Sequence, residues 1–504
     1  EGAGNLSLRA GGDIEGQQDT IDKTGDLTGT TGTLTAQYWW QWMQTGNSPT
    51  RSSINFGAFD QGLMSVGGNV SVQAGGNIRQ LSVSLPTTWQ IVNDANGVSS
   101  LLTYGGGNLD VHAGGDILSG SYFVARGQGT IQAGGQIGSD FSVPYTTPSQ
   151  QAATMPVSTL IAMQDSQLSV QAGGSVSLGG IFNPSWLDAS GVSALAPAGH
   201  ADGQGYSARS RIDVTALGGD LTYGDLASPI GLFAPGVATG KRSLDTAGDI
   251  LPATVSLIAA RGDLSLLTSG ALFPSDQGNL SLLAQDNVRF NITGRGQASR
   301  YAWGIIDAPL TSLASPLNLS PLNGDPNSIA GSVRQVGYLG KNGFSLDPAI
   351  QAFFHAANPW HAGDIDPVRI YALQGDILNG SGGGVAGAIL MPNKVTRIEA
   401  GRDIVDLSFL GQQIHDADIT VIRAGRDIVD TPLAVSTPVD PLVNVLPAIA
   451  QAGLGYLMLA ADRDLSCLLS PSEKVAGTAR ATFLHQAAPV GGGAYTRIDS
   501  LRYH

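Results

Sequence analysis

One short phrase recurs along this chain and restricts the folds that the chain can adopt. It consists of an alternating apolar triplet, a turn of small residues, an Asp or Asn, and then Ile, Leu or Val, and clear copies span 4–14, 68–78 and 107–117. Shorter or drifted copies end at Ile137, Val176, Leu221, Leu264, Val288, Ile377, Ile404, Ile428 and Leu465. Repetition of this kind is typical of a solenoid, in which each repeat packs only against its neighbours.

Each phrase predicts one β-strand followed by a sharp turn. Alternation such as Leu6-Ser7-Leu8 places apolar side chains on one face of a strand and polar ones on the other. In the turn, we expect glycine and Asx residues to supply positive φ angles and Asx side chains to hydrogen-bond the nearby backbone. This interpretation assigns a structural turn role to Gly12, Asp13, Gly76, Asn77, Gly115, Asp116, Asp403 and Asp427.

The recurrence of one turn after one kind of strand favours parallel stacking over an antiparallel sandwich. The turn residues Asp376, Asp403 and Asp427 are separated by 27 and 24 residues, which is about one solenoid coil. Parallel connections within a sheet are almost always right-handed. We therefore predict an all-β fold, a right-handed parallel β-helix with loop and short-helix insertions.

The phrases divide the chain into two coil regions and a long insertion. Residues 1–288 are predicted to form coils with insertions at about 37–62, 79–106, 140–165, 180–210 and 226–247. Residues 289–368 are the long insertion, with a short helix near 347–357 that begins at Asp347-Pro348. Residues 369–504 are expected to continue the coils to a truncated end.

Composition excludes several classes of protein. The 26 basic and 40 acidic residues give a net charge of −14, which is unfavourable for a nucleic-acid partner. Cys467 is the single cysteine, so a disulfide framework within the chain and a zinc site of several cysteines are excluded. The segment 441–461 has no charged residue, but it contains two prolines and two glycines, so we expect a short buried segment and not a membrane helix.

The phrases at 4–14, 68–78 and 107–117, with the Ala-Gly-Arg-Asp-Ile pair at 400–404 and 424–428, resemble the repeat region of filamentous haemagglutinin-type exoproteins, which belong to the two-partner secretion family of Gram-negative bacteria. The resemblance covers most of the chain, as strand and turn phrases, but not its insertions. It implies a long secreted β-helix at the bacterial cell surface, exported by an outer-membrane partner transporter.

Four features are candidates for binding or chemistry. Trp39, Trp40 and Trp42, together with Trp360, are possible partner-binding residues, because aromatic rings stack on sugars and are enriched at interfaces. A hydrophobic flap packed on the coils is the alternative for the first three. The tripeptide 261–263 is Arg-Gly-Asp, an integrin-type motif, but it lies in the register of the turns.

His355 and His361 lie near Trp360 but lack a third ligand at the spacing that a metal site needs, so no metal or other cofactor is expected. Asp403 and Asp427, one coil apart, are the closest approach to the carboxylate pair of a glycosidase. However, Arg402 and Arg426 accompany them, which favours a charge-compensated ladder.

The sequence thus predicts a structural rod segment of a large secreted bacterial surface adhesin, without catalysis. The insertions would bind a glycan or protein on a host or neighbouring cell, or the rods would assemble end to end into filaments. Two other functions stay open at this point. One is a carbohydrate-active β-helix enzyme, either a polysaccharide lyase or a glycosidase, and the other is the stalk of a contact-dependent toxin delivery protein.

Overall fold

A computed structural model describes the strands of the chain and the segments beside them. The described residues are 4–16, 54, 62–140, 142–146, 152–183, 206–224, 249–268, 270–290, 302–307, 355, 359–380, 387–431, 448–466, 482–485 and 496–498. They form two compact units. Unit 1 holds the described residues up to Leu217 together with Gly224, and unit 2 holds Gly218–Tyr223 and the described residues from Asp249 onward. Within these ranges no helix is long and apolar enough to cross a membrane.

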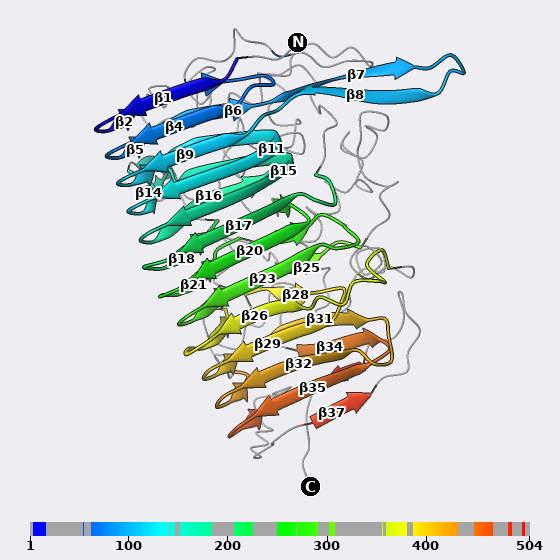
Figure 1. Ribbon diagram of the computed structural model, residues 1–504. Coiled ribbons are helices and arrows are strands. Elements are labelled where there is room, and N and C mark those ends of the chain that lie inside the picture. Colours follow the sequence, from blue (N-terminus) through cyan, green and yellow to red (C-terminus); the bar gives the residue numbers. More distant parts are fainter. Residues whose placement is uncertain are drawn as a thin grey trace. The chain divides into compact units, whose positions relative to one another are not determined.

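Unit 1 is built from three stacks of short parallel strands (Figure 1). The first stack contains β1 (Leu6–Ala10), β4 (Val70–Ala74), β9 (Leu109–Ala113), the second part of β11 (Ser121–Ala133), the second part of β15 (Thr159–Ala172), and β17 (Arg211–Ala216). The second stack contains β2 (Ile14–Glu15), β5 (Ile78–Arg79), β10 (Ile117–Leu118), β12 (Ile137–Gly138) and β16 (Val176–Phe182). The third contains β3 (Leu63–Met64), β6 (Ser82–Leu85) and the first parts of β11 and β15.

Unit 2 repeats the three-stack arrangement. The first stack contains β20 (Thr254–Ala259), β23 (Asn279–Ala284), β26 (Val368–Ala372), β29 (Thr396–Ala400), β32 (Ile419–Ala424) and β35 (Tyr456–Ala461). The second contains β18 (Leu221–Tyr223), β21 (Leu264–Leu266), β24 (Val288–Phe290), β27 (Ile377–Asn379), β30 (Ile404–Val405), β33 (Ile428–Val429) and β36 (Leu465–Ser466). The third contains β19 (Asp249–Leu251), β22 (Gly270–Leu272), β25 (Ala302–Ile305), β28 (Ile389–Met391), β31 (Ser408–Gln413) and β34 (Ala448–Gly453).

The predicted parallel β-helix is therefore confirmed, and its core is made of aliphatic columns. In unit 1 the residues of one inward column are in register and fully buried: Val72, Val111, Ile131, Val170 and Val214. The corresponding column of unit 2 contains Leu257, Leu282, Ile370, Ile398, Ile422 and Leu459. Burial of each such side chain contributes about 1.5–3 kcal/mol, so stability comes from stacking one coil on the next.

Four of the segments predicted as insertions contain residues of coil strands. β6 lies within 79–106, the first part of β15 within 140–165, the end of β16 within 180–210 and β25 within 289–368, and each pairs in parallel with strands of the third stack. The residues of β6 are buried at every position, so its sequence lacks the alternation that identifies a half-buried strand. The short helix expected near 347–357 lies outside the described residues except for His355, and the insertion expected at 226–247 lies outside them entirely.

True insertions in unit 1 form two antiparallel hairpins. β7 (Thr87–Asn93) pairs with β8 (Ser99–Gly105), and β13 (Ser142–Thr146) pairs with β14 (Ala152–Pro156). The β7–β8 hairpin leaves the third stack after β6, and its tip extends well away from the coils of unit 1 (Figure 1). Both hairpins fall outside the repeated phrases, so antiparallel pairing interrupts the coils without replacing their stacking.

The last coil of unit 2 is covered by two further strands. β37 (Thr482–His485) pairs antiparallel with β35, and β38 (Thr496–Ile498) pairs antiparallel with β34. Free strand edges invite pairing with another chain, and these two are occupied. The uncharged segment 441–461, predicted to be buried, supplies β34 and β35, in which Ile449, Leu457 and Leu459 are buried.

Candidate functional site

The turn residues of unit 1 form a ladder of hydrogen bonds between coils. The side-chain oxygen of Asp13 accepts a bond from the backbone N–H of Asn77 at 2.7 Å. Oδ1 of Asn77 accepts a bond from the backbone N–H of Asp116, and Oδ1 of Asp116 accepts one from the backbone N–H of Gln136, each at 2.8 Å. The Asx side chains thus bond the following coil and not their own turn, which differs from the predicted local bond. A ladder of this kind fixes the register of successive coils, because each rung joins equivalent residues.

The glycines of this turn are required for a different reason from the predicted positive φ. None of the turn glycines at 11–12, 75–76, 114–115 and 134–135 has a positive φ. Instead, a Cβ on Gly114 would lie 2.3 Å from the carbonyl oxygen of Gly75, and one on Gly115 would lie 2.2 Å from Oδ1 of Asn77. The stacked coils approach so closely here that a side chain does not fit, and this excludes other residues.

In the later coils of unit 2 the same turn carries arginines. Asp376 accepts bonds from the Arg402 guanidinium at 2.6 and 3.1 Å and from the backbone N–H of Asp403 at 2.9 Å. Asp403 is held in the same way by Arg426 and the N–H of Asp427. The predicted charge-compensated ladder is therefore present.

This ladder also favours a structural role for Asp403 and Asp427 over a catalytic one. The Asp427 carboxylate is bound by Arg463 and by the backbone N–H of Asp464. Burial acts to raise its pKa, but these hydrogen bonds outweigh it and hold the pKa of Asp427 below its ordinary value. A glycosidase acid must keep its proton near neutral pH, which needs a raised pKa. The carboxylates of Asp403 and Asp427 are thus both engaged in the hydrogen bonds and ion pairs of the turn.

The Arg-Gly-Asp tripeptide at 261–263 belongs to the ladder as well. Asp263 accepts bonds from Asn287 at 2.8 and 2.9 Å and from Nε of Arg289 at 2.8 Å. Although burial acts to raise the pKa of Asp263, these bonds lower it overall. A Cβ on Gly262 would lie 2.2 Å from Oδ1 of Asp220 in the previous coil. The turn interpretation of this motif is therefore favoured over an integrin-type site.

The predicted histidines lie in a buried cluster of unit 2. Nδ1 of His361 is 3.2 Å from Oδ1 of Asp307, and both side chains are at most 2% exposed. Burial lowers the pKa of His355 to about 4, against the opposing bond between its Nε2 and the Pro392 carbonyl, and the nearby His361 lowers it further. In the described part of the chain, no three His, Cys, Asp or Glu side chains are placed to hold a metal ion.

The tryptophan candidates differ in what the structure describes. Trp360 is 39% exposed, and its backbone N–H donates to Oδ1 of Asp307 at 2.9 Å. The ring of Trp360 is thus exposed at the surface of a loop that this hydrogen bond anchors. Trp39, Trp40 and Trp42 lie outside the described residues.

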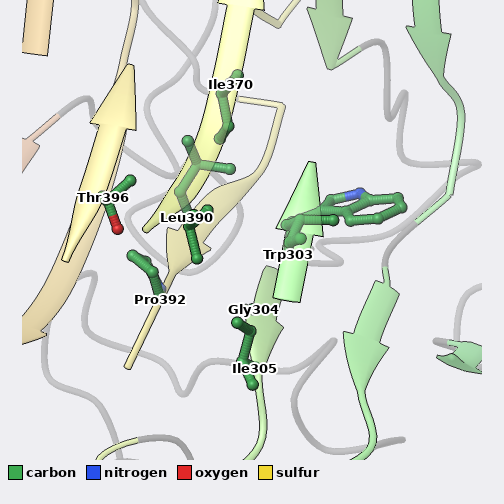
Figure 2. A pocket seen from close by; sticks show the side chains of 9 residues that line it. Trp303, Gly304, Ile305, Ile370, Leu390, Pro392 and Thr396 are labelled. Carbon is green, nitrogen blue, oxygen red and sulfur yellow. The ribbon is translucent and has the colours of Figure 1, made fainter. Parts of the chain in front are cut away.

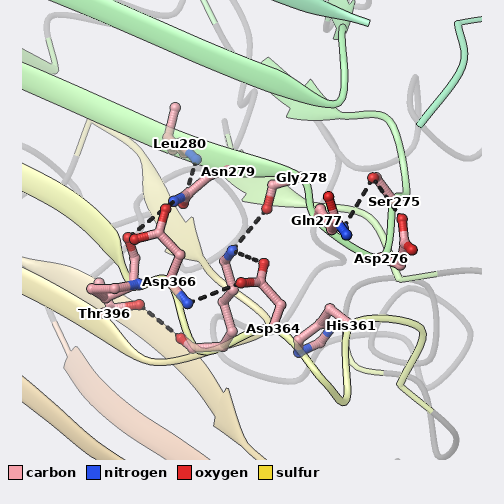
Figure 3. A network of polar contacts seen from close by, with 12 residues as sticks. Ser275, Asp276, Gln277, Gly278, Asn279, Leu280, His361, Asp364, Asp366 and Thr396 are labelled. Atoms are coloured by element: carbon pink, nitrogen blue, oxygen red, sulfur yellow. Dashed lines mark hydrogen bonds and ion pairs between the residues drawn. The ribbon is translucent and has the colours of Figure 1, made fainter. Parts of the chain in front are cut away.

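A polar network that the repeat phrases do not indicate anchors the same loop. Nζ of the buried Lys394 is 2.6 Å from Oδ2 of Asp364 and 2.8 Å from the Gly278 carbonyl oxygen (Figure 3). Asp366 is bound by Arg369 and by Nδ2 of Asn279, both at 2.5 Å (Asn279 and Asp366 in Figure 3). Burial lowers the pKa of Lys394, although Asp364 opposes the change. Every ionic group has a partner, so the network fastens 361–366 to the coils.

A small apolar cavity lies inside the coils of unit 2. Trp303, Ile305, Leu390 and Pro392 line it together with Leu280, Gly304, Val368, Ile370 and Thr396 (Figure 2). The Trp303 indole N–H is already bonded to the Thr268 carbonyl oxygen at 2.8 Å, and its ring meets that of Tyr223 edge-on. With no convergent polar groups, the cavity resembles a packing defect more than a ligand site.

Among the described residues of unit 1, those of the β7–β8 hairpin form the most exposed apolar feature. Val98, Leu102 and Tyr104 are 62%, 42% and 53% exposed, and Asp94 is the one charged residue between 87 and 105. Oδ1 of Asp94 accepts bonds from the backbone of Asn96 and Val98, both at 2.8 Å, and Gly97 has a φ of 77°. These bonds set a tight Asx turn at the tip. The hairpin therefore presents apolar side chains on a defined support.

Comparisons of the chain with models of protein families, with curated proteins and with solved structures find no match. The repeat phrases and the described geometry are therefore the grounds for a functional proposal.

Proposed function

We propose that this chain is a structural segment of a secreted bacterial surface adhesin, in which the coils are a scaffold and the insertions contact another cell. The observation that carries the proposal is the β7–β8 hairpin, which extends from the coils with Val98, Leu102 and Tyr104 exposed. Exposed apolar patches on soluble proteins mark interaction sites. Loops and hairpins held on a rigid scaffold are the usual place for such sites.

The engagement of the turn carboxylates supports a non-catalytic role. Asp376, Asp403 and Asp427 each bind an arginine and a backbone N–H of the next coil. Groups that recur in coil after coil serve architecture, whereas catalysis needs one exceptional place. The export route through a partner transporter and the bacterial cell surface as the location follow from the family resemblance alone and form part of the proposal.

Adherence of coated beads tests the proposal. Beads carrying the full chain are applied to epithelial monolayers and to bacterial lawns, and the bound beads are counted. We expect Leu102→Ser with Tyr104→Ser to reduce adherence at least about tenfold, because truncated apolar anchors at interfaces commonly cost more than 1.4 kcal/mol. The matched control is Ile365→Ser with Leu373→Ser, which removes exposed apolar side chains of unit 2, 90% and 53% exposed.

Two results would overturn the proposal. One is equal adherence of the hairpin variant and the unmodified chain, which would remove the hairpin from any contact. The other is release of reducing ends or unsaturated products from a polysaccharide panel, abolished by replacing one or two carboxylates. That result would establish the carbohydrate-active alternative.

A further inference from the structure

The outward face of the first stack in unit 1 carries two columns of polar side chains. One column contains Ser7, Ser71, Asp110, Thr130, Ser169 and Asp213, and the other contains Arg9, Gln73, His112, Gln132, Gln171 and Thr215. All twelve are exposed or half-buried, and none is apolar. The parallel register places equivalent side chains about 4.8 Å apart from coil to coil and about 6.6 Å apart along each strand.

The centre of this face is uncharged. β11 and β15 present Gln128, Thr130, Gln132, Gln167, Ser169 and Gln171, which we call the amide–hydroxyl patch, with members of the two strands in register. On one side of it Nε2 of His112 is 2.7 Å from Oδ1 of Asp110, and on the other Arg211 is paired with Asp213 at 2.7 and 2.8 Å, while Arg126 and Asp165 flank the patch where β11 and β15 enter this face. An ionic partner would therefore find no unpaired charge at the centre of the patch.

The hydrogen-bonding groups of the patch are largely unused. Among the described residues, the side chains of Thr130, Gln132, Ser169 and Gln171 make no hydrogen bond, and Gln167 makes one, to the Arg209 carbonyl oxygen at 3.4 Å. Each amide offers donors and an acceptor, and each hydroxyl offers both. The patch is thus a regular two-dimensional array of donors and acceptors.

A position on the outward face of the first stack does not by itself require an amide or hydroxyl side chain. The equivalent positions of unit 2 hold Ile258, Leu283, Val421 and Met458, all half-buried, together with Arg369 and Arg397. The same fold therefore accepts apolar and charged residues on this face, and unit 1 differs by its run of amides and hydroxyls.

We propose that the amide–hydroxyl patch binds an extended neutral polysaccharide that lies across the coils. Such a polysaccharide repeats its hydroxyl groups along one direction, as the patch repeats its amides. It carries no charge and little apolar surface, and the patch offers no partner for either. Individual hydrogen bonds contribute little net free energy, but several made at once add up. The inference rests on the proposed function in taking the chain to be a binding segment.

Affinity electrophoresis of the full chain tests the inference. Gels contain hydroxyethyl cellulose, xylan, mannan or dextran as neutral probes, and polygalacturonate as the acidic probe. We expect at least one neutral probe to retard the chain and the variant Thr130→Ala/Gln132→Ala/Ser169→Ala/Gln171→Ala to bind at least about tenfold more weakly. The conservative variant Thr130→Ser/Gln132→Asn/Ser169→Thr/Gln171→Asn should keep most of the retardation, and Ser256→Ala/Ser281→Ala in unit 2 should change nothing.

The remaining outcomes contradict the inference. Retardation by no neutral probe, retardation by polygalacturonate alone, or equal binding by the four-alanine variant would each remove the patch as a neutral-glycan site. So would a loss of self-association in that variant, seen as a smaller size in solution, because the face would then contact a second copy of the chain. The bead variant Leu102→Ser/Tyr104→Ser should retain glycan binding, so failure of the adhesin proposal and failure of this inference are distinguishable.

Discussion

Units 1 and 2 use the same coil, but the later coils of unit 2 close its main turn with different residues. In unit 1 the second turn residue is glycine, as at Gly76 and Gly115, and a Cβ there would strike the Asx side chain of the preceding coil. In the later coils of unit 2 the same place is taken by Arg402, Arg426 and Arg463, whose guanidinium groups bind that Asx carboxylate, whereas earlier coils of unit 2 keep glycine there, at Gly262 and Gly375. The Asx side chain of the preceding coil thus lies against a glycine in some coils and binds an arginine in others, so one backbone ladder tolerates two solutions.

The first turn residue is a closely packed glycine in coils of both units. A Cβ on Gly114 of unit 1 or on Gly425 of unit 2 would lie 2.3 Å from a carbonyl oxygen of the preceding coil. We expect Gly114→Val and Gly425→Val each to lower the free energy of unfolding by about 3 kcal/mol or more, since the coils must separate to admit the side chain. Denaturant unfolding measures the loss.

Gly11→Val is the control for this pair, because nothing lies within 4 Å of a Cβ built there. We expect it to cost less than either of the other substitutions. Equal costs at all three positions would mean that the glycines are needed for conformation and not for close stacking.

Buried histidine should make unit 2 sensitive to acid in a way that unit 1 is not. Unfolded His355 would bind a proton near its ordinary pKa of 6.5, whereas in the fold burial lowers the pKa to about 4. Its contribution to stability is therefore complete above pH 6.5 and is lost as the pH falls to about 4, and the full difference is about 3 kcal/mol.

Hydrogen exchange of each unit, measured at several pH values, checks this prediction. Replacing His355 by Gln should flatten the loss of protection in unit 2 across that range and leave unit 1 unchanged. An identical pH profile with and without the histidine would contradict the expected coupling.

Salt should distinguish the two ladders. Asp403→Ala removes the acceptor of the Arg426 guanidinium and of the Asp427 N–H, and Asn77→Ala removes the acceptor of the Asp116 N–H. We expect each to cost about 1 kcal/mol, but only the cost of Asp403→Ala should shrink at high ionic strength, because only that ladder contains exposed ion pairs. Melting temperatures at low and high salt give the comparison, and equal salt dependence would refute the distinction.

The smallest effect is expected from replacing an arginine in a turn of unit 2 by the glycine that unit 1 has at the same place. Arg402→Gly removes a partly exposed ion pair to Asp376 but keeps the backbone bond from residue 402 to the Gly375 carbonyl oxygen. The loss should be about 0.5 kcal/mol in the free energy of unfolding. A loss several times larger would show that the arginine side chains, and not the backbone ladder, hold these coils in register.

The first two stacks of each unit could be predicted from sequence, because the strands of the first alternate apolar and polar residues before a fixed turn and those of the second begin at the Ile, Leu or Val that follows it. The third stack could not. β25, with the sequence Ala-Trp-Gly-Ile, and β6, with Ser-Val-Ser-Leu, carry no phrase, and both fell within predicted insertions. A strand buried on both faces has no period-two pattern, and short apolar runs are ambiguous in sequence.

The site was predictable to a similar degree. The Asp403 and Asp427 turns and their compensation by arginine follow from the recurring Gly-Arg-Asp, because identical turns in stacked coils must lie side by side. The direction of each Asx bond, to the next coil and not to the local backbone, depends on the stacking distance, which the sequence does not encode locally. The network of Lys394 and Asp364 joins residues 30 apart in loops without a repeat, so no spacing rule could have found it.

Spin-label distances test the stacked register most directly. On a Cys467→Ser background, labels at Ser71 and Asp213 lie in one outward column of unit 1 and are separated by four strand spacings, about 19 Å. Labels at Ser7 and Asp213 are separated by five, about 24 Å. We predict two narrow distance distributions whose means differ by about one strand spacing. Broad distributions, or means that do not increase by this step, would contradict the stacked coils on which every other conclusion depends.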